Sequence, residues 1–282
     1  MNEALQIIVI AAHPDEAEIY AGGTAALYAE LGHNVKFVSL TNGDCGHYSM
    51  KGKELIERRT QEACEAARRI GVKEYTILDI PDGQLSSTHE VRSEVIRLVR
   101  NWKADVVLTF HPDGPGHVDN RGAGKIVRDC ADFIAMVPNA VPDAPHLLKS
   151  PLFLLMPDYA KRNAYRPDIV VAVDSAIEKK LLGCDAHASQ FYEFAPWQRG
   201  FLDSVPSGWE DRRQYILDNW SAFLNVSEEM KGSLETFYGK EAASCVRYAE
   251  PFEVADYGRM PDEEEKRALF PMLYPQYREQ HQ

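Results

Sequence analysis

A short apolar run near the N-terminus decides the class of fold more than any other part of this chain. Residues 6–12, QIIVIAA, are almost continuously apolar and rich in β-branched side chains. A strand with that pattern is buried on both faces, as strands in a parallel sheet are. The run ends in His13, Pro14, Asp15 and Glu16. An imidazole and two adjacent carboxylates at a strand end indicate either a solvated turn or part of a metal site.

The first half of the chain alternates between strand and helix patterns. Strands are predicted over 6–12, 34–44 with its turn, 74–83 with its turn, and 104–110. Helices are predicted over 22–32, 52–71 and 87–103. This alternation is typical of an α/β fold, in which a mostly parallel sheet carries helices on both faces. Ligands of such sheets bind beyond the carboxyl ends of the strands, where the strand order reverses.

The second half is less regular, and we expect it to complete the same domain. Strands are predicted over 152–156 and 168–174, and helices over 175–191 and 207–231, the last with Ser207 as N-cap. No repeat or low-complexity linker interrupts the chain. The predicted organisation is a core over 1–205 with a C-terminal helical extension, 206–282, packed on it.

Composition excludes several classes of partner. The 282 residues carry a net charge of −12, which argues against nucleic-acid and acidic-membrane binding, since both need a basic surface. No apolar run approaches the roughly 20 residues of a membrane span, and the N-terminus does not resemble a signal peptide. The five scattered cysteines suit reduced thiols. We therefore expect a cytoplasmic protein with a small-molecule partner, with homo-oligomerisation left open.

A second polar cluster follows the strand at 104–110. The loop HPDGPGHVDNRGAG, residues 111–124, holds the side chains His111, Asp113, His117, Asp119 and Asn120. Each cluster alone is explained by a turn. Because both follow parallel strands at their carboxyl ends, they are expected to meet at one edge of the sheet and form a site.

The residue types suit a hydrolytic metal centre. Such a zinc site uses about three protein ligands and leaves a position for water, whose proton a nearby carboxylate accepts. His13 and Glu16 are candidate ligands, and Asp15 is the candidate base. A residue from 117–120 would complete the ligand set.

Several segments, in order along most of the chain, resemble the LmbE-like, or PIG-L, deacetylases. They are AHPDEAE and the following GG (12–23), TNGDCGHY (41–48), RTQEACEAARRIG (59–71), DIPDG (79–83), HVDNR (117–121), HASQFYEFAPW (187–197) and ADYGR (255–259). The resemblance implies a Rossmann-like three-layer sandwich with a mostly parallel sheet. It also implies hydrolysis of an N-acetyl group, often from an N-acetylglucosamine conjugate, with zinc or another divalent metal.

The resemblance also implies a role for each matching position. His13 and Glu16 would be metal ligands with position 120 as the third, Asp15 the general base, His117 the oxyanion-stabilising histidine, Asp119 an orienting carboxylate, and Arg59 and His187 substrate-facing residues. Asp44 could bind substrate hydroxyls, although Asn-Gly-Asp is equally a plain turn.

Two positions depart from the family pattern. Glu16 stands where the family has aspartate, so a carboxylate remains available as a metal ligand. Asn120 stands where the family has a histidine as its third metal ligand. An amide oxygen is a poor zinc ligand compared with imidazole. Three alternatives remain open: Asn120 binds the metal weakly, His117 or His111 replaces it as a ligand, or the metal is lost. The two hypotheses are thus a metal-dependent deacetylase and a non-catalytic ligand-binding relative with a degraded metal site.

Overall fold

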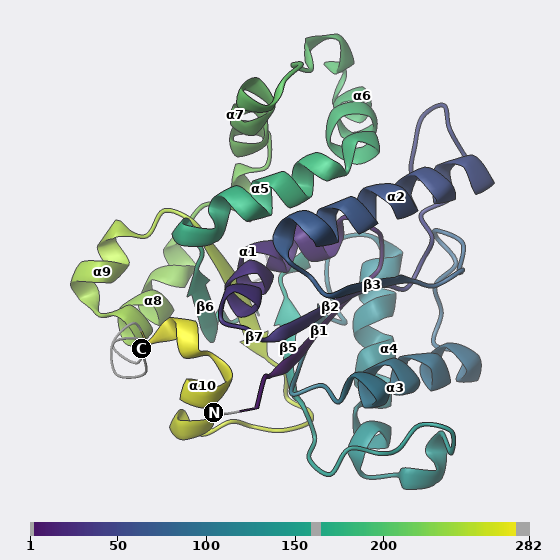
Figure 1. The fold of residues 1–282 in the computed structure, drawn as a ribbon, viewed down its shortest axis with the longest axis vertical. Coiled ribbons are helices and arrows are strands. Elements are labelled where there is room, and N and C mark those ends of the chain that lie inside the picture. Colours follow the sequence, from purple (N-terminus) through teal and green to yellow (C-terminus); the bar gives the residue numbers. More distant parts are fainter. Residues whose placement is uncertain (1–2, 159–164, 275–282) are drawn as a thin grey trace.

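A computed structural model describes residues 3–158 and 165–274, whose strands form one seven-stranded sheet (Figure 1). The strands are β1 (Gln6–Ala11), β2 (Asn34–Ser39), β3 (Glu74–Ile77), β4 (Val106–Phe110), β5 (Leu152–Met156), β6 (Ile169–Ala172) and β7 (Ala249–Val254). Their order is β3-β2-β1-β4-β5-β7-β6. All neighbours from β3 to β5 pair in parallel, and β7 pairs antiparallel with β5 and β6. This confirms the predicted α/β fold with a mostly parallel sheet.

The strand order reverses between β1 and β4. From β1 the chain moves outward to β2 and β3, and it then returns to β4, on the other side of β1. The loops that follow β1 and β4 therefore diverge to opposite faces and leave a crevice between them. The two polar clusters of the sequence occupy these two loops.

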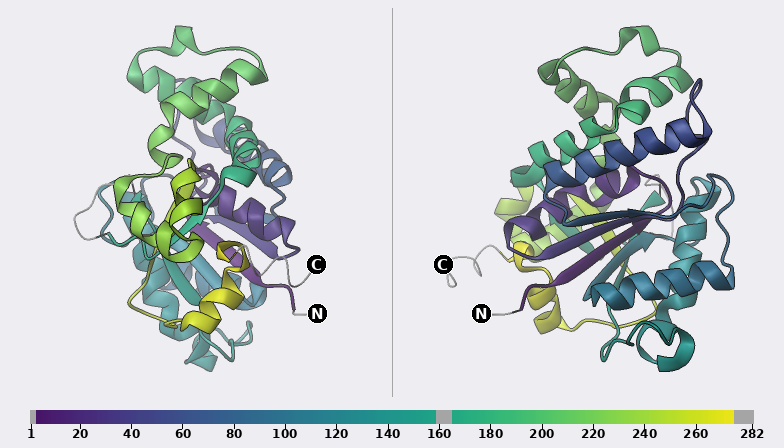
Figure 2. Two further views of the ribbon diagram at one scale, coloured as in Figure 1. Left: turned by 90° about the vertical axis from the view of Figure 1, so that its left-hand side faces the viewer. Right: turned by 45° about the vertical axis from the view of Figure 1, so that its right-hand side comes forward.

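Helices cover both faces of the sheet, which makes three layers (Figure 2). The helices are α1 (Glu16–Glu30), α2 (Gly52–Ile70), α3 (His89–Trp102), α4 (Val118–Ala135), α5 (Ile177–Ala186), a π-helix (Ser189–Phe194), α6 (Ala195–Arg199), α7 (Trp209–Asn219), α8 (Lys231–Tyr238), α9 (Lys240–Cys245) and α10 (Glu263–Leu269). One face carries α1, α2 and α5, and the other carries α3 and α4.

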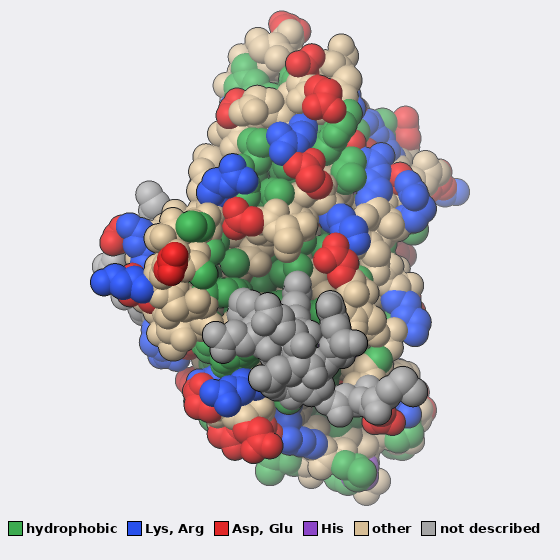
Figure 3. All heavy atoms as spheres, turned by 60° about the vertical axis from the view of Figure 1, so that its left-hand side comes forward, with side chains coloured by type: hydrophobic (Ala, Val, Ile, Leu, Met, Phe, Trp, Pro, Cys, Tyr) green, Lys and Arg blue, Asp and Glu red, His purple; other side chains and the backbone are tan. Residues whose placement is uncertain are grey.

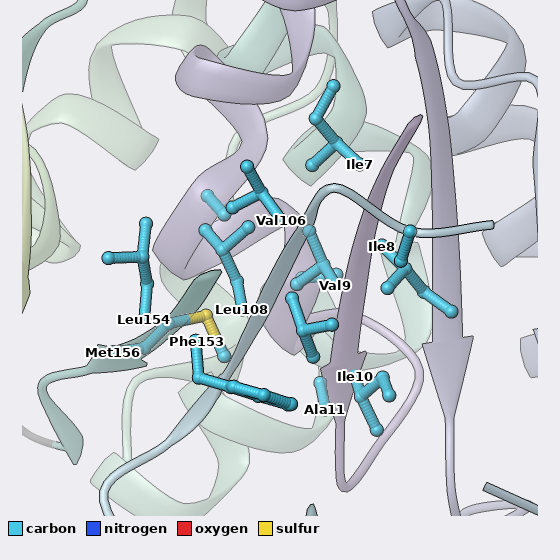
Figure 4. Packing of buried hydrophobic residues seen from close by; sticks show 14 of the residues in the cluster. Ile7, Ile8, Val9, Ile10, Ala11, Val106, Leu108, Phe153, Leu154 and Met156 are labelled. Carbon is cyan, nitrogen blue, oxygen red and sulfur yellow. The ribbon is translucent and has the colours of Figure 1, made fainter. Parts of the chain in front are cut away.

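The central strands form the core, as their unbroken apolar pattern predicts. Residues 7–11 of β1 are at most 1% exposed, and their side chains pack with those of β4 and β5 (Figure 4). Burying one such aliphatic side chain contributes roughly 1.5–3 kcal/mol. This rigid centre holds the loop after β1 in place.

Three helices differ from their predicted bounds. The first begins at Glu16, directly after the polar turn, so that Gly22 and Gly23 lie inside it, where a Cβ at Gly23 would meet Val173 at 2.7 Å. Helix α5 ends at Ala186, before the π-helix. The helix predicted over 207–231 ends at Asn219, and its N-cap is Gly208 rather than Ser207.

The region after residue 205 is not purely helical, because it contributes β7 to the sheet. Glu250 of β7 reaches back to α1, where its carboxylate accepts the N–H groups of Gly23 and Thr24 at 2.8 and 2.7 Å. It also pairs with Lys180 of α5 at 2.7 Å, and both side chains are buried. The division at residue 205 stays a prediction, but the expectation of a helical extension is corrected.

The surface mixes charges of both signs. On the face seen in Figure 3, acidic and basic side chains are interspersed among apolar and uncharged ones. Among the described residues, no helix is both long and apolar enough to span a bilayer. All five cysteines are free.

Candidate active site

A cavity of ≈ 410 Å³ opens at the reversal point between β1 and β4. It is lined from the first polar turn by His13, Asp15, Glu16, Ile19 and Tyr20, from other loops and helices by Cys45, Gly46, Arg59, Asp82 and His117, and from the later segment by Gln190, Phe191, Phe194, Ala195, Gln198, Arg199, Trp220 and Phe223. The prediction that the two strand ends form one site is consistent with this geometry.

Three carboxylates surround the imidazole of His13. Glu16 Oε1 lies 3.2 Å from His13 Nδ1, whereas Asp82 Oδ1 and Asp119 Oδ2 lie 3.1 and 3.4 Å from Nε2. Burial alone lowers the pKa of His13, but the three carboxylates outweigh it and raise that pKa well above its ordinary value. The carboxylates around this ring therefore favour a positive charge at this place. Either a proton on the ring or a bound cation would supply that charge.

A candidate metal centre lies at this ring. Its members are His13, Asp82, His117 and Asp119, whose ligand atoms all lie within 4.8 Å of one another. Asp119 is fully buried, and its two oxygens accept the N–H groups of Gly83 and Leu85 at 2.6 and 3.1 Å. A carboxylate held by two amides is suited to orienting the imidazole of His13, as carboxylates do behind metal-binding histidines.

On the opposite side of the ring, two atoms could act as metal ligands, and they are His13 Nδ1 and Glu16 Oε1. Glu16 Oε2 accepts the N–H groups of Ala12 and His13 at 3.0 and 2.8 Å, and this fixes the carboxylate with Oε1 beside His13 Nδ1. Two ligands of a tetrahedral zinc ion with bonds of about 2.1 Å lie about 3.4 Å apart. The 3.2 Å separation of these two atoms matches that spacing.

Asn120 carries a buried amide oxygen with no partner. Its Nδ2 donates to Asp158 Oδ1 at 3.1 Å, whereas Oδ1 has no hydrogen-bond partner among the described residues. A buried acceptor without a donor is costly unless an ion or water satisfies it. The imidazole of His13, the carboxylate of Glu16 and the unpartnered amide oxygen of Asn120 together fit a divalent cation. This ligand set is harder than one in which a second imidazole replaces the amide oxygen.

The loop after β4 closes tightly around Asp158. Gly116 donates its N–H to this carboxylate at 2.8 Å. A Cβ at Gly116 would lie 2.2 Å from Asp158 Oδ1, and one at Gly114 would lie 2.7 Å from Oδ2. Glycine is therefore required at both positions, and Asp158 fixes which way the amide of Asn120 points.

Asp15 is held in an unusual backbone conformation on the cavity wall. Its φ of 130° is rare for a residue with a side chain and costs of the order of 1–3 kcal/mol. Burial raises the pKa of Asp15 to about 6, while the guanidinium of Arg59 acts in the opposite direction. Arg59 Nη2 lies 3.6 Å from Asp15 Oδ1 and donates to Pro14 O at 2.7 Å. A carboxylate with this pKa is ionised at neutral pH and able to accept a proton.

His117 lies at the N-cap of α4, edge-to-face with His13 at 4.9 Å between ring centroids. Its Nδ1 accepts the N–H of Asp119 at 3.3 Å, so a neutral ring carries its proton on Nε2. That arrangement leaves the Nε2–H group as a hydrogen-bond donor on the cavity wall.

Three other candidate residues lie elsewhere. His187 is fully buried with Nε2 3.0 Å from Glu18 Oε1 and is not among the residues that line the cavity, so its contact with substrate stays a prediction. Asp44 accepts the N–H of Asp82 at 2.9 Å and so shapes that loop, while its contact with substrate stays a prediction. His111 does not belong to the four-residue cluster.

The sequence analysis did not single out Asp82 and Asp158. Asp82 lies in the loop after β3, and Asp158 follows β5 by two residues. Both obey the rule that polar residues after parallel strands meet at one sheet edge. The signal was present, but a single aspartate in a Pro or Gly turn looks like ordinary turn chemistry.

Comparison with known proteins finds a family model that matches part of this chain and relatives that match most of it. Residues 8–131 match the family model PIG-L, GlcNAc-PI de-N-acetylase. The diacetylchitobiose deacetylase of Thermococcus kodakarensis is 29% identical over 201 residues, which cover 68% of this chain and 72% of that protein. The solved structure of N,N'-diacetylchitobiose deacetylase from Pyrococcus horikoshii has a TM-score of 0.66 and 26% identity, covering 97% of this chain and 88% of that one.

A relative with a different activity also matches. The 4-oxalmesaconate hydratase of Pseudomonas putida is 24% identical over 237 residues, covering 79% of this chain and 91% of that protein. The family model, the deacetylase relatives and the shared fold agree with the motifs found in the sequence. Residues 8–131 thus match the PIG-L family model, and over most of its length the chain is similar to two diacetylchitobiose deacetylases.

Proposed function

We propose that this protein is a metal-dependent hydrolase that removes the N-acetyl group from an N-acetylated sugar conjugate. The observation that carries the proposal is the position of Asp15, whose pKa is raised to about 6, beside the cation-favouring ring of His13 on one cavity wall. A base next to a cation site is the arrangement that activates water for hydrolysis.

The metal we propose is zinc or another divalent ion, held by His13 Nδ1, Glu16 and Asn120. The 3.2 Å spacing of the first two donors and the unpartnered oxygen of Asn120 support this set. Asp119 and Asp82 would then hold the ring from its Nε2 side. A bound divalent ion supplies Lewis acidity, which lowers the pKa of water and polarises the amide carbonyl.

The protein side chains would move the protons. Asp15 accepts a proton from the water that adds to the amide carbon, and it delivers that proton to the nitrogen as the carbon–nitrogen bond breaks. Acetate and a free amine result. His117 donates from Nε2 to the oxygen that becomes negatively charged. Arg59 keeps Asp15 ionised and in place.

The first test combines metal content with activity. We expect near-stoichiometric divalent metal in protein purified without chelator, and acetate release from N-acetylglucosamine or N,N'-diacetylchitobiose. Asp15→Ala should lower kcat by about 10²–10⁴-fold with metal retained. The matched control Asp113→Ala changes an exposed carboxylate outside the cavity and should leave both readings unchanged. Unchanged activity in Asp15→Ala would contradict the proposal.

Two other functions give distinct results. Protein that binds no metal, even after incubation with zinc, and hydrolyses no N-acetylated sugar would support the ligand-binding alternative. Hydration of an unsaturated acid is the second catalytic candidate, because the match to the hydratase covers 79% of this chain. It predicts water addition to 4-oxalmesaconate without acetate release from sugars.

A further inference from the structure

The turn between β1 and α1 is strained and needs support from other parts of the chain. We call residues 12–16 the β1–α1 turn, and it carries the proposed ligands His13 and Glu16 and the proposed base Asp15. The φ of 130° at Asp15 is unfavourable, and among the described residues the side chain of this N-cap accepts no capping hydrogen bond. Such a conformation persists only where surrounding contacts hold it. Those contacts therefore bear on the proposed reaction.

One supporting contact is an ion pair buried behind the turn. Glu18 lies in the first turn of α1, and its Oε1 is 3.0 Å from Nε2 of His187. Both side chains are 0% exposed, and the hydroxyl of Tyr75 donates to the other carboxylate oxygen of Glu18 at 3.4 Å. Burial lowers the pKa of His187, but Glu18, Asp15 and Glu62 outweigh that effect and raise this pKa. The surroundings of the ring therefore favour an imidazolium, which attracts the carboxylate of Glu18.

His187 also belongs to the segment that forms another wall of the cavity. It is the C-cap of α5, which packs on α1, and the π-helix begins two residues later (Figure 1). Its carbonyl oxygen accepts the N–H groups of Gln190 and Phe191 at 3.0 and 2.9 Å, and both of these residues line the cavity. Neither Glu18 nor His187 is among the lining residues. The ion pair thus joins the start of α1 to the start of the π-helix from outside the cavity.

We propose that His187, through its ion pair with Glu18, is a positioning residue that holds Asp15 and Glu16 at their places in the cavity. This inference rests on the proposed function, because it concerns the groups that we assign as base and metal ligand. The role needs no contact between His187 and substrate. Since Glu18 follows Glu16 by two residues, a shift of the first turn of α1 moves both carboxylates together. A displacement of about 1 Å, caused by a change away from the reacting groups, can lower a rate about 10²-fold.

A second buried ion pair that holds α1 provides a matched control. Lys180 of α5 lies 2.7 Å from Glu250, which accepts the N–H group of Gly23 in α1 at 2.8 Å. Gly23 follows Glu16 by seven residues, about two helical turns. Both His187→Gln and Glu250→Gln leave a buried charge without its partner and should destabilise the fold. The first change, unlike the second, removes support beside the β1–α1 turn.

The first readout is hydrogen exchange in metal-free protein, which does not depend on activity. Amide N–H groups across the β1–α1 turn are hydrogen-bonded to Glu16 and Asp15. At a temperature where all variants are folded, we expect the peptide covering residues 12–19 to exchange about tenfold faster in His187→Gln than in the wild type, because the turn opens locally. In Glu250→Gln this peptide should exchange like the wild type.

The second readout separates positioning from a general loss of stability. If the wild type releases acetate, His187→Gln should lower kcat about 10²-fold with little change in KM, whereas Glu250→Gln should retain the wild-type kcat. Equal losses of kcat in the two variants, or faster exchange without a loss of kcat, overturn the inference. A loss of kcat without faster exchange also overturns it, in favour of direct contact between His187 and substrate.

Failure of the proposed function gives a different result. If the wild type hydrolyses neither N-acetylglucosamine nor N,N'-diacetylchitobiose, the exchange rates alone decide whether His187 holds the turn. Faster exchange in His187→Gln than in Glu250→Gln supports that role, and equal exchange overturns it. If His187→Gln does not fold, Tyr75→Phe takes its place in both readouts with the same expected directions, because it removes the hydroxyl that donates to Glu18.

Discussion

At the scale of the residue, Asn120 is the position that decides how strongly the proposed site would bind a metal ion. Asp158 takes its amide N–H, and the amide oxygen is left buried without a donor. That geometry makes the side chain a fixed oxygen donor. A neutral oxygen holds zinc less strongly than an imidazole nitrogen does.

We expect Asn120→His to raise zinc affinity at least tenfold and Asn120→Ala to lower it, as measured by competition with a chromogenic chelator. The new imidazole could donate to Asp158 in place of the amide, as metal-binding histidines donate to carboxylates. Asp82→Ala tests the alternative in which the metal ion binds on the Nε2 side of His13. If it abolishes binding while both Asn120 variants leave affinity unchanged, the ion lies among His13, Asp82, His117 and Asp119.

At the scale of the element, a single arginine holds the end of one helix. Arg100 of α3 is 1% exposed, and its guanidinium donates to backbone carbonyl oxygens in the last turn of α4 and the segment after it. Those carbonyls belong to Phe133, Ile134, Val137, Pro138, Val141 and Ala144. The last carbonyls of any helix lack partners within it, and Arg100 supplies them here.

Arg100→Met should lower the free energy of unfolding by about 3 kcal/mol, because buried carbonyls lose their donors. The measurement is the midpoint of urea denaturation followed by circular dichroism. Arg97→Met on the same helix is the matched control, since that side chain makes surface ion pairs with Glu94 and Asp143. It should cost at most about 1 kcal/mol. Equal losses in the two variants would show that Arg100 has no special structural role.

At the scale of the whole molecule, the C-terminal region completes the sheet. Strand β7 lies between β5 and β6, and its Glu250 joins α1 and α5 through hydrogen bonds and a buried ion pair. A buried charge that loses its partner is strongly destabilising. The part of the chain before residue 205 thus depends on the part after it.

A chain ending at residue 205 should not unfold cooperatively, since it lacks β7 and leaves Lys180 buried without Glu250. Thermal denaturation monitored by circular dichroism checks this against the full chain. Glu250→Gln in the full chain should keep a cooperative transition but lower its midpoint, which separates the ion pair from the strand. If the truncated chain melts like the full one, the parts before and after residue 205 are independent folding units.

Local patterns in the sequence determined much of this protein. Contiguous residues predict the apolar strands, the helices between them and the polar turns after β1 and β4. This is possible because strand and helix periodicity depend on near neighbours in the sequence. The rule that ligands gather at the carboxyl ends of parallel strands then located the cavity. Asp15 and His117 line it as the sequence analysis expected.

Only the tertiary structure decided which distant groups meet. Strand β7 enters the sheet through pairing with β5 and β6, which its own six residues do not encode. His187 is buried against Glu18, and Asp82 reaches His13, because packing brings separate loops together. Tyr48 and Trp197 stack across 149 positions of sequence for the same reason. Burial and partner choice depend on the whole chain, so no local pattern can specify them.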